Sequence, residues 1–513
     1  MLVKTYCAAV NGLQVTTVMI EVSVESGQAI SLSGLGDEAV KESLSRIRTA
    51  FLYNNYKFPN SNTTINLAPA DLRKEGAAFD LPIAIGILAA SEGMPVTHLG
   101  EYMMIGELGL DGRLQPIRGA LPIAIRARKE KYKGIIVPKE NAREAAVVDQ
   151  LEVYGMETLF EVVEFLSDKY EAEPVVYDTR KVFYENQCSC ELDFAEVRGQ
   201  ESVKRAMEIA AAGGHNMIMI GPPGSGKSMM AKRLPGILPP LSLAESLETT
   251  QIHSIAGKLG AEATLISQRP FRSPHHTVSQ VALCGGGGKA MPGEISLAHN
   301  GVLFYDELPE FSKSTLEVLR QPLEDRRITI SRARYSIEYP CSFMFVASAN
   351  PCPCGYYGDR THNCVCTPGQ IQRYMNKISG PLLDRIDLQI ELIPVPFDEL
   401  RKTTTSEPSS SIREKVMAAR KIQEERYKNH PLVHCNAQMT PALMREYCQL
   451  DEKTLSLLEK DMTKLDLSAR AYDRILKVPR TIADYEGCAD ITSTHIAEAI
   501  SYRNLDRNSW GQG

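Results

Sequence analysis

The chain has 513 residues, which at about 150 residues per domain corresponds to roughly three domains. Hydrophobic residues make up 43% of the chain and charged residues 23%, a balance that supplies large apolar cores and excludes global disorder. The formal net charge of −6 excludes a protein coated with positive charge, so nucleic acid would have to be bound by local basic patches.

Residues 1–170 alternate strand and helix patterns and form the first expected domain. Strands are predicted at 15–24, 65–68, 103–107 and 134–138, and helices at 37–54, 80–92, 120–130 and 140–148. The longest apolar run, residues 81–90, is about half the length of a membrane span, so it predicts a buried helix and no membrane segment.

Polar stretches divide the rest of the chain. Residues 171–192 are expected to be a linker, 193–397 a larger αβ domain, 398–411 a second linker and 412–513 a helical domain, with helices at 412–427 and 493–503. The first residues show no basic region followed by an apolar stretch. We therefore expect a cytoplasmic protein whose 12 cysteines are reduced.

A glycine-rich segment, residues 221–228, has the sequence GPPGSGKS and lies between an apolar strand pattern at 217–220 and a helical pattern from 229. This context predicts a phosphate-binding loop for ATP, with successive backbone N–H groups turned toward the phosphates. Lys227 is expected to reach the β- and γ-phosphates and Ser228 to ligate Mg²⁺. The segment consists of Gly221, Pro222, Pro223, Gly224, Ser225, Gly226, Lys227 and Ser228.

Two further apolar strands end in polar residues. The first, residues 301–305, ends in Asp306, expected to hold Mg²⁺, and Glu307, expected to act as general base toward the attacking water. The second, residues 343–349, ends in Asn350, expected to orient that water. The alternatives are a solvated strand end for the carboxylates and a turn-forming role for the amide.

This order of features resembles an AAA+ ATPase: a phosphate-binding loop, a strand that ends in Asp and Glu, a strand that ends in Asn, and then a helical domain. In that superfamily an arginine from the neighbouring subunit completes the site, and residues 381–387 (PLLDRID) make Arg385 the corresponding residue. The segment 467–470 resembles the second sensor and points to Arg470, with Arg474 and Arg480 as nearby alternatives. The segment 197–200 resembles the adenine-side motif and includes Gln200.

Residues 269–276 (RPFRSPHH) and 292–299 resemble the helix-2 insert of magnesium-chelatase and related helicase clades. Residues 327–339 predict a β-hairpin that resembles the pre-sensor hairpin of the same branch. Its tip would present Arg332 and Arg334 to DNA in the pore of a ring. The alternative is that these arginines form surface ion pairs.

The whole chain resembles the ComM/YifB family of Mg-chelatase-like AAA+ ATPases. The resemblance implies an α/β fold: a P-loop AAA+ module with a parallel sheet and a C-terminal helical lid, preceded by a Lon-protease-like α+β domain. It also implies a homohexameric DNA helicase that promotes branch migration in recombination or natural transformation, with single-stranded or branched DNA as its partner. Alternatives are an ATPase that remodels a protein partner or inserts a metal, and a nucleotide-gated scaffold that barely turns over.

The N-terminal domain resembles a Lon-type peptidase that has lost its catalytic pair. Ala78 stands where the nucleophilic serine is expected, and Leu121 where the lysine is expected. Neither side chain can act as nucleophile or base. We therefore expect a non-proteolytic domain that serves assembly or DNA binding.

Four cysteines follow Asn350 in a C-x-C…C-x-C array: Cys352, Cys354, Cys364 and Cys366. Four thiolates in a loop rich in glycine and proline suit a structural Zn²⁺ site. His362 could replace one thiolate, and unmetallated thiols are the alternative. A second pair, Cys188 and Cys190, is expected to be structural or incidental.

Overall fold

The computed structural model describes residues 2–34, 36–72, 74, 76–91, 94, 97–187, 192–260, 265–288, 290–332, 335–359, 362–394, 406–465 and 469–503, and for residues 332, 335, 461, 463–465 and 469–471 only the backbone. The chain divides into two compact units. Unit 1 comprises Met1–Glu185, Leu243–Ser267 and Ala290–Pro292, and unit 2 comprises Asn186–Ser242, Gln268–Lys289 and Gly293–Gly513.

Unit 1 is built on a mixed seven-stranded sheet with the order β3-β4-β2-β1-β5-β8-β9. The antiparallel pair β1 (Leu2–Asn11) and β2 (Gln14–Glu25) runs through its middle, and β2 also pairs antiparallel with β4 (Asn62–Ala68). The other strands are β3 (Ile30–Ser33), β5 (Tyr102–Met104), β8 (Gly134–Pro138) and β9 (Glu152–Met156). This is the α+β architecture expected for the N-terminal domain.

Helix α2 (Asp80–Ser91) forms the centre of the unit 1 core, because ten of its residues are buried. It packs on β1, β2 and α1 (Glu38–Tyr53), which begins at the side-chain cap of Asp37. Unit 1 also contains helices α3 (Ala120–Lys129), α4 (Lys139–Ala145) and α5 (Leu159–Leu166). Helix α9 (Leu243–Ala256) also belongs to unit 1, where it packs on α3.

Unit 2 contains a five-stranded sheet with the order β11-β14-β17-β10-β18, in which every adjacent pair is parallel. Its strands are β10 (Met217–Ile220), β11 (Phe271–Arg272), β14 (Val302–Tyr305), β17 (Met344–Ala349) and β18 (Leu388–Glu391). Residues of β10, β14 and β17 are buried throughout, as expected for a parallel sheet covered on both faces.

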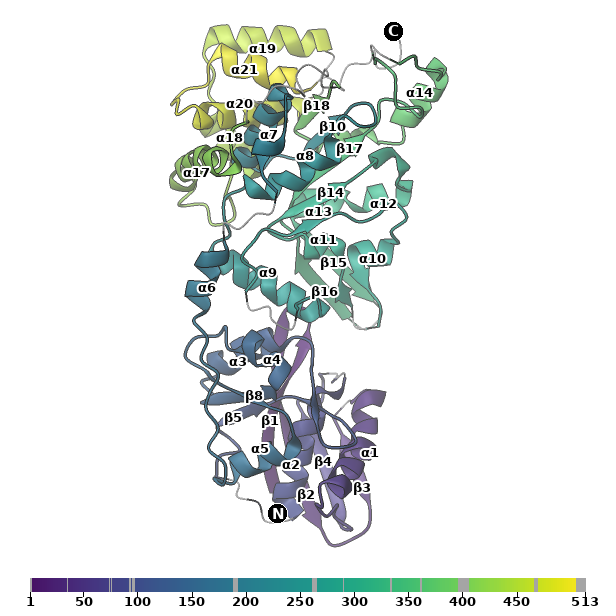
Figure 1. Ribbon diagram of the computed structural model, residues 1–513, viewed down its shortest axis with the longest axis vertical. Helices are drawn as coiled ribbons and strands as arrows, with labels where there is room; N and C mark the ends of the chain where they lie inside the picture. The colour runs from purple at the N-terminus through teal and green to yellow at the C-terminus, as the bar shows by residue number, and fades with distance from the viewer. Residues whose placement is uncertain are drawn as a thin grey trace. The chain divides into compact units, whose positions relative to one another are not determined.

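The C-terminal part of unit 2 is helical (Figure 1). Helix α17 (Ser409–Arg426) and helix α20 (Ala469–Tyr485) both pack on α7 (Glu201–Gly213), the helix that precedes β10. Helices α18 (Pro441–Tyr447) and α21 (Ser493–Ser501) pack on α20, and α19 (Glu452–Leu465) packs on α21. The α/β class, the parallel sheet and the helical C-terminal region are therefore confirmed.

Several predicted elements differ from those observed. Helix α6 (Thr179–Asn186) lies in the segment predicted as the first linker, and its Phe183 is buried. The strand predicted at 103–107 is interrupted between β5 and the short β6 (Glu107–Leu108), and α17 begins three residues earlier than predicted, at Ser409. Among the described helices, none combines the length and apolar character that crossing a membrane would require.

Candidate active site

Three adjacent strands bring the predicted site residues to one edge of the unit 2 sheet. Strand β17 lies between β10 and β14, and all three are parallel. The glycine-rich loop follows β10, Asp306 and Glu307 follow β14, and Asn350 follows β17. The carboxyl ends of neighbouring parallel strands form the usual ligand-binding edge of such a sheet.

The loop before α8 (Lys227–Arg233) has the backbone that a phosphate cradle requires. Gly224 and Gly226 have φ values of +78° and +91°, which L-residues rarely adopt. A Cβ atom at Gly224 would meet nothing within 4 Å, so this side of the loop is open. The Ser225 hydroxyl is buried and has no hydrogen-bond partner among the described residues. An anionic ligand would supply such a partner, so the loop fits a triphosphate.

Lys227 folds back over the loop. Its Nζ donates to the carbonyl oxygens of Gly221 at 2.7 Å and Pro222 at 2.9 Å, and to Oδ1 of Asn350 at 3.2 Å. Burial lowers the pKa of Lys227, and the carboxylates of Asp306 and Glu307 partly offset that effect. The ammonium group therefore already joins the loop to the strand-end amide.

The two carboxylates have different surroundings. Asp306 accepts a hydrogen bond from Ser228 at 2.7 Å and another from Ser348. Glu307 has left-handed backbone angles, φ +55° and ψ +54°, and its N–H donates to the Ser348 hydroxyl at 3.0 Å. A non-glycine residue in this region carries a conformational cost of order 1–3 kcal/mol, and such residues cluster at functional sites.

Sequence reasoning missed Ser348, which contacts both carboxylate residues. It lies in β17, whose sequence is MFVASA and whose six residues are all buried. A single hydroxyl in a buried apolar strand needs a partner, and that requirement was the available signal.

The remaining predicted ATP-site residues that the structure describes have other partners. Arg385 forms an ion pair with Glu324 and donates to the Pro381 carbonyl at 2.7 Å. Gln200 has a left-handed backbone and donates from Nε2 to the Ile393 carbonyl at 2.6 Å. The side chain of Arg470 lies outside the described residues.

The two alternatives to Arg470 are engaged in ion pairs. Arg474 lies 3.1 Å from the buried Asp387, which is also bonded to His215. Arg480 lies 2.8 Å from the buried Asp484. Both arginines therefore contribute to packing of the helical part of unit 2.

The predicted hairpin is present as the antiparallel pair β15 (Arg327–Arg332) and β16 (Tyr335–Pro340). At its base Arg327 pairs with Glu338 at 2.8 Å. The side chain of Arg332 and all of Arg334 lie outside the described residues.

The four predicted cysteines converge. Their sulfur atoms all lie within 4.8 Å of one another, with Cys352–Cys354 at 3.3 Å and Cys352–Cys364 at 3.6 Å. His362 instead stacks on the ring of Tyr356, with ring centroids 4.8 Å apart. Cys188 and Cys190 lie outside the described residues.

In unit 1, the residues at the positions expected for a peptidase serine and lysine, Ala78 and Leu121, form hydrogen bonds through their backbone atoms. The Ala78 carbonyl accepts from the Gly106 N–H at 3.0 Å, and the Leu121 N–H donates to Glu144 at 2.9 Å. The thiol of Cys7 lies 3.9 Å from the Ala78 carbonyl, but burial raises its pKa to about 12, so it stays protonated.

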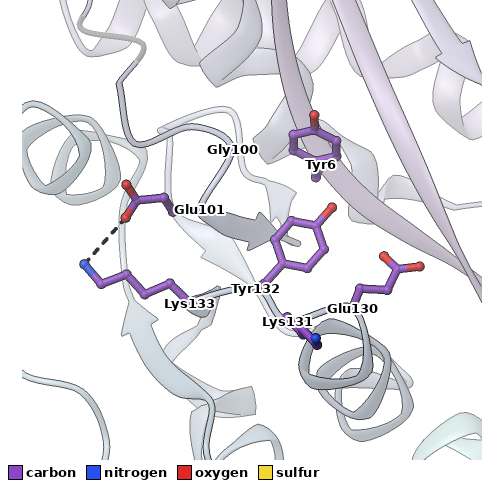
Figure 2. A pocket seen from close by; sticks show the side chains of 7 residues that line it. All are labelled: Tyr6, Gly100, Glu101, Glu130, Lys131, Tyr132 and Lys133. Carbon is purple, nitrogen blue, oxygen red and sulfur yellow. Dashed lines mark ion pairs between the residues drawn. The ribbon is translucent and has the colours of Figure 1, made fainter.

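Unit 1 also contains a hollow with a volume of about 500 Å³. Figure 2 shows the side chains that line it. Its rim carries the ion pair of Lys133 and Glu101 at 3.6 Å. Its described lining contains no serine, threonine or cysteine, so its only hydroxyl groups are the two tyrosine phenols: Tyr6, Gly100, Glu101, Glu130, Lys131, Tyr132 and Lys133.

Comparison with known proteins matches three family models to successive parts of the chain. "Subunit ChlI of Mg-chelatase" matches residues 20–141, "Magnesium chelatase, subunit ChlI" matches 193–400, and "Magnesium chelatase, subunit ChlI C-terminal" matches 406–503. The second of these ranges contains the phosphate loop, both strand-end motifs and the cysteine cluster.

The chain is also similar to known proteins over nearly its whole length. The chain is 45% identical to competence protein ComM of Haemophilus influenzae over 508 residues, covering 98% of this chain and 97% of that protein. It is 44% identical to a protein named YifB of Escherichia coli, with 97% and 96% covered. A segment of 139 residues, 26% of this chain, is 24% identical to Lon protease 1 of Syntrophobacter fumaroxidans.

Proposed function

The chain belongs to the ComM/YifB family of Mg-chelatase-like AAA+ ATPases, and from this premise we propose that it is a cytoplasmic ring motor that uses ATP to move DNA. The motor would be a homohexamer that acts on single-stranded or branched DNA and drives branch migration. The observation that carries the ATP-dependent part is the contact of Ser228 with Asp306 at 2.7 Å beside an open glycine loop.

The residues at the sheet edge fit ATP with Mg²⁺. Ser228 and Asp306 would hold the ion, which supplies positive charge against the phosphate oxygens when bound. Lys227 would bind the β- and γ-phosphates. Glu307 would take a proton from the attacking water, and Asn350 would orient that water.

The proposed hexamer is supported by Arg385. AAA+ sites resembling this one lie between subunits, and a planar guanidinium suits the charge that develops on a γ-phosphate. Within this chain Arg385 is paired with Glu324, whose side chain is 66% exposed. We propose that assembly transfers Arg385 from Glu324 to the neighbouring subunit's nucleotide.

The proposed action on DNA is supported by the hairpin and by the relative named a competence protein. In a ring, six hairpin tips with Arg332 and Arg334 would form a basic lining that the net charge of −6 conceals. The N-terminal unit would serve as an assembly or DNA-binding collar without peptidase activity.

The test is the ATPase rate with and without forked or four-way DNA, at stated salt because phosphate contacts weaken as salt rises. The R332A/R334A double variant should lose DNA stimulation and keep its basal rate. Arg327→Ala is the matched control, because this arginine is on the same hairpin but paired with Glu338. A parent protein that no DNA stimulates would contradict the proposal.

A second candidate function is ATP-driven remodelling of a protein partner or insertion of a metal. It is favoured by the three magnesium chelatase family models. ATPase stimulation by a protein partner, together with no response to DNA, would select it.

The cysteine cluster supports a structural Zn²⁺ as a further cofactor. Zn–S bonds of about 2.3 Å in a tetrahedral site place the sulfurs about 3.8 Å apart. The observed separations of 3.3, 3.5 and 3.6 Å are close to that value. Cys352, Cys354, Cys364 and Cys366 would hold the ion, and a thiol reagent should release one zinc per chain from the parent protein.

A further inference from the structure

From the position of the cysteine cluster we infer that it is a positioning device for the ATP site, in which bound zinc sets the affinity for nucleotide. The metal would fix one loop that holds both Asn350 and the proline ring of the phosphate loop. This inference rests on the ATP and zinc sites proposed above, and it is independent of what the motor acts on.

The first link is the connection to Asn350. Cys352 follows it by two residues and is fully buried. The Cys352 carbonyl accepts from the Gly355 N–H at 3.0 Å, which closes a turn within the cluster. Asn350 itself accepts from Lys227 at 3.2 Å. The first two cysteines are therefore one short turn away from a direct contact with the phosphate-binding lysine.

The second link is a packing contact between Gly355 and Pro223. Gly355 lies between Cys354 and Tyr356, is buried, and has a φ value of +87°. A Cβ atom on Gly355 would lie 2.6 Å from Cδ and 2.8 Å from Cγ of Pro223. The backbone of the cysteine loop is thus in contact with the phosphate loop, at a spot that admits glycine alone.

The third link is α14, the helix that follows the last cysteine of the cluster. Cys366 precedes Thr367, which caps α14 (Pro368–Met375) with a reciprocal bond to Gln370. Near the end of α14, burial raises the pKa of Tyr374, and the backbone of Asn350 lies close enough to its hydroxyl to act in the opposite direction. The segment before the cluster begins at Asn350, and the segment after it leads through α14 back to Asn350. The four sulfur atoms join these two segments.

This arrangement explains why a metal would matter to the ATP site. Metal binding supplies folding free energy to a loop that has few apolar side chains of its own. A loop without the metal would let Asn350 and Pro223 move. Misplacement of a positioning group by about 1 Å can lower a reaction rate by about 100-fold, and we expect a displaced phosphate loop to bind nucleotide more weakly for the same geometric reason. Zinc loading should therefore be visible as nucleotide affinity.

A pair of glycine variants tests the contact without touching a ligand. Gly355→Ala places a methyl group against Pro223, whereas Gly358→Ala has a similar φ of +79° and nothing within 4 Å. Both variants should keep one zinc per chain. Gly355→Ala should raise the dissociation constant of a fluorescent ATP analogue at least about tenfold, and Gly358→Ala should leave it within about twofold. Equal affinities in the two variants would overturn the inference.

Removal of the metal tests the same idea from the other side. Cys354→Ser and Cys366→Ser should lose zinc and bind the analogue at least about tenfold more weakly, with far-UV circular dichroism unchanged. Treatment of the parent protein with a chelator should weaken its binding of the analogue to the same extent, and addition of zinc should restore the affinity. Zinc-free parent protein with the original nucleotide affinity would refute the inference. The DNA proposal would survive that result, because these measurements use no DNA.

Discussion

The Ser228 hydroxyl lies 2.7 Å from Oδ2 of Asp306, although 78 positions separate the two residues in the chain. The contact joins the phosphate loop after β10 to the strand end of β14, across the intervening β17. The residue that mediates from β17 is Ser348, which contacts Asp306 and the Glu307 N–H. Hydrogen bonds from the hydroxyl groups of two serines therefore connect the ends of the three strands within the protein itself.

Ser348→Ala should lower kcat for ATP hydrolysis while leaving KM nearly unchanged. The substitution removes one hydrogen bond to a carboxylate, worth about 1.5–3 kcal/mol, and leaves the Glu307 N–H unpaired. A loss of that size corresponds to about 10–100-fold in rate. Steady-state phosphate release measures it. The exposed Ser314→Ala is the control and should behave as the parent.

Glu307→Gln should bind ATP but hydrolyse it about 10²–10⁴-fold more slowly, because the amide cannot accept the proton of the attacking water. Lys227 contacts Asn350 and the loop carbonyls, so nucleotide binding should be kept. Single-turnover hydrolysis and binding of a fluorescent analogue separate the two effects. Glu310→Gln, whose parent side chain pairs with Lys377 at 3.7 Å, is the control. A Glu307→Gln protein with parental turnover would exclude Glu307 as the base.

Arg385→Ala should reduce kcat by about 10³-fold or more if the arginine acts on a neighbouring subunit's nucleotide. The decisive measurement mixes two inactive variants, Arg385→Ala and Lys227→Ala. In mixed rings an intact Lys227 site can face an intact Arg385, so part of the activity should return. A mixture as inactive as its components would place Arg385 outside the proposed trans role.

The N-terminal unit should have no peptidase activity, and Ala78→Ser alone should not create any. The new hydroxyl would lack a base at position 121, where leucine stands. Casein hydrolysis and labelling with a fluorophosphonate probe measure the outcome. Labelling of the Ala78→Ser variant at the new serine would show that another group activates it.

Much of the ATP site could be predicted because its signals are local. The bounds of β10 match the predicted 217–220, since an apolar strand is marked sharply by the glycine loop that follows it. The C-x-C pairs likewise predicted that Cys352 and Cys364 meet, and their sulfurs are 3.6 Å apart. In each case the residues that define the pattern are also the residues in contact.

Features that depend on distant partners could not be predicted in this way. In the sequence, Ser348 cannot be distinguished from other small core residues. Its role depends on Asp306, which is 42 positions away in the chain and which only the fold brings into contact with it. Helix α6 has only 8 residues, too few for a periodic pattern to stand out in a polar stretch. Helix α9 follows the phosphate loop in sequence but packs on α3 of unit 1, a choice that only tertiary contacts reveal.

The buried Asp387, which pairs with Arg474, should make unit 2 sensitive to acid. Burial alone would raise the pKa of Asp387, but the hydrogen bond with His215 and the charges of Arg474 and Lys477 outweigh it and hold the pKa well below its usual value. A depressed pKa in the folded state stabilises the fold above the unfolded value of about 3.9, and that contribution is lost as pH falls below it.

Asp387→Asn should therefore cost about 3 kcal/mol in the free energy of unfolding at pH 7, because it removes the buried carboxylate that faces Arg474 and is hydrogen-bonded to His215. The difference from the parent should shrink as pH falls below about 4, because the Asp387 carboxyl of the parent then takes up a proton on unfolding, which favours the unfolded state. Urea unfolding followed by circular dichroism at several pH values measures both effects. The exposed Asp473→Asn, next to Arg474, is the control. A difference that is independent of pH would show that the cost arises from packing and not from the charge of Asp387.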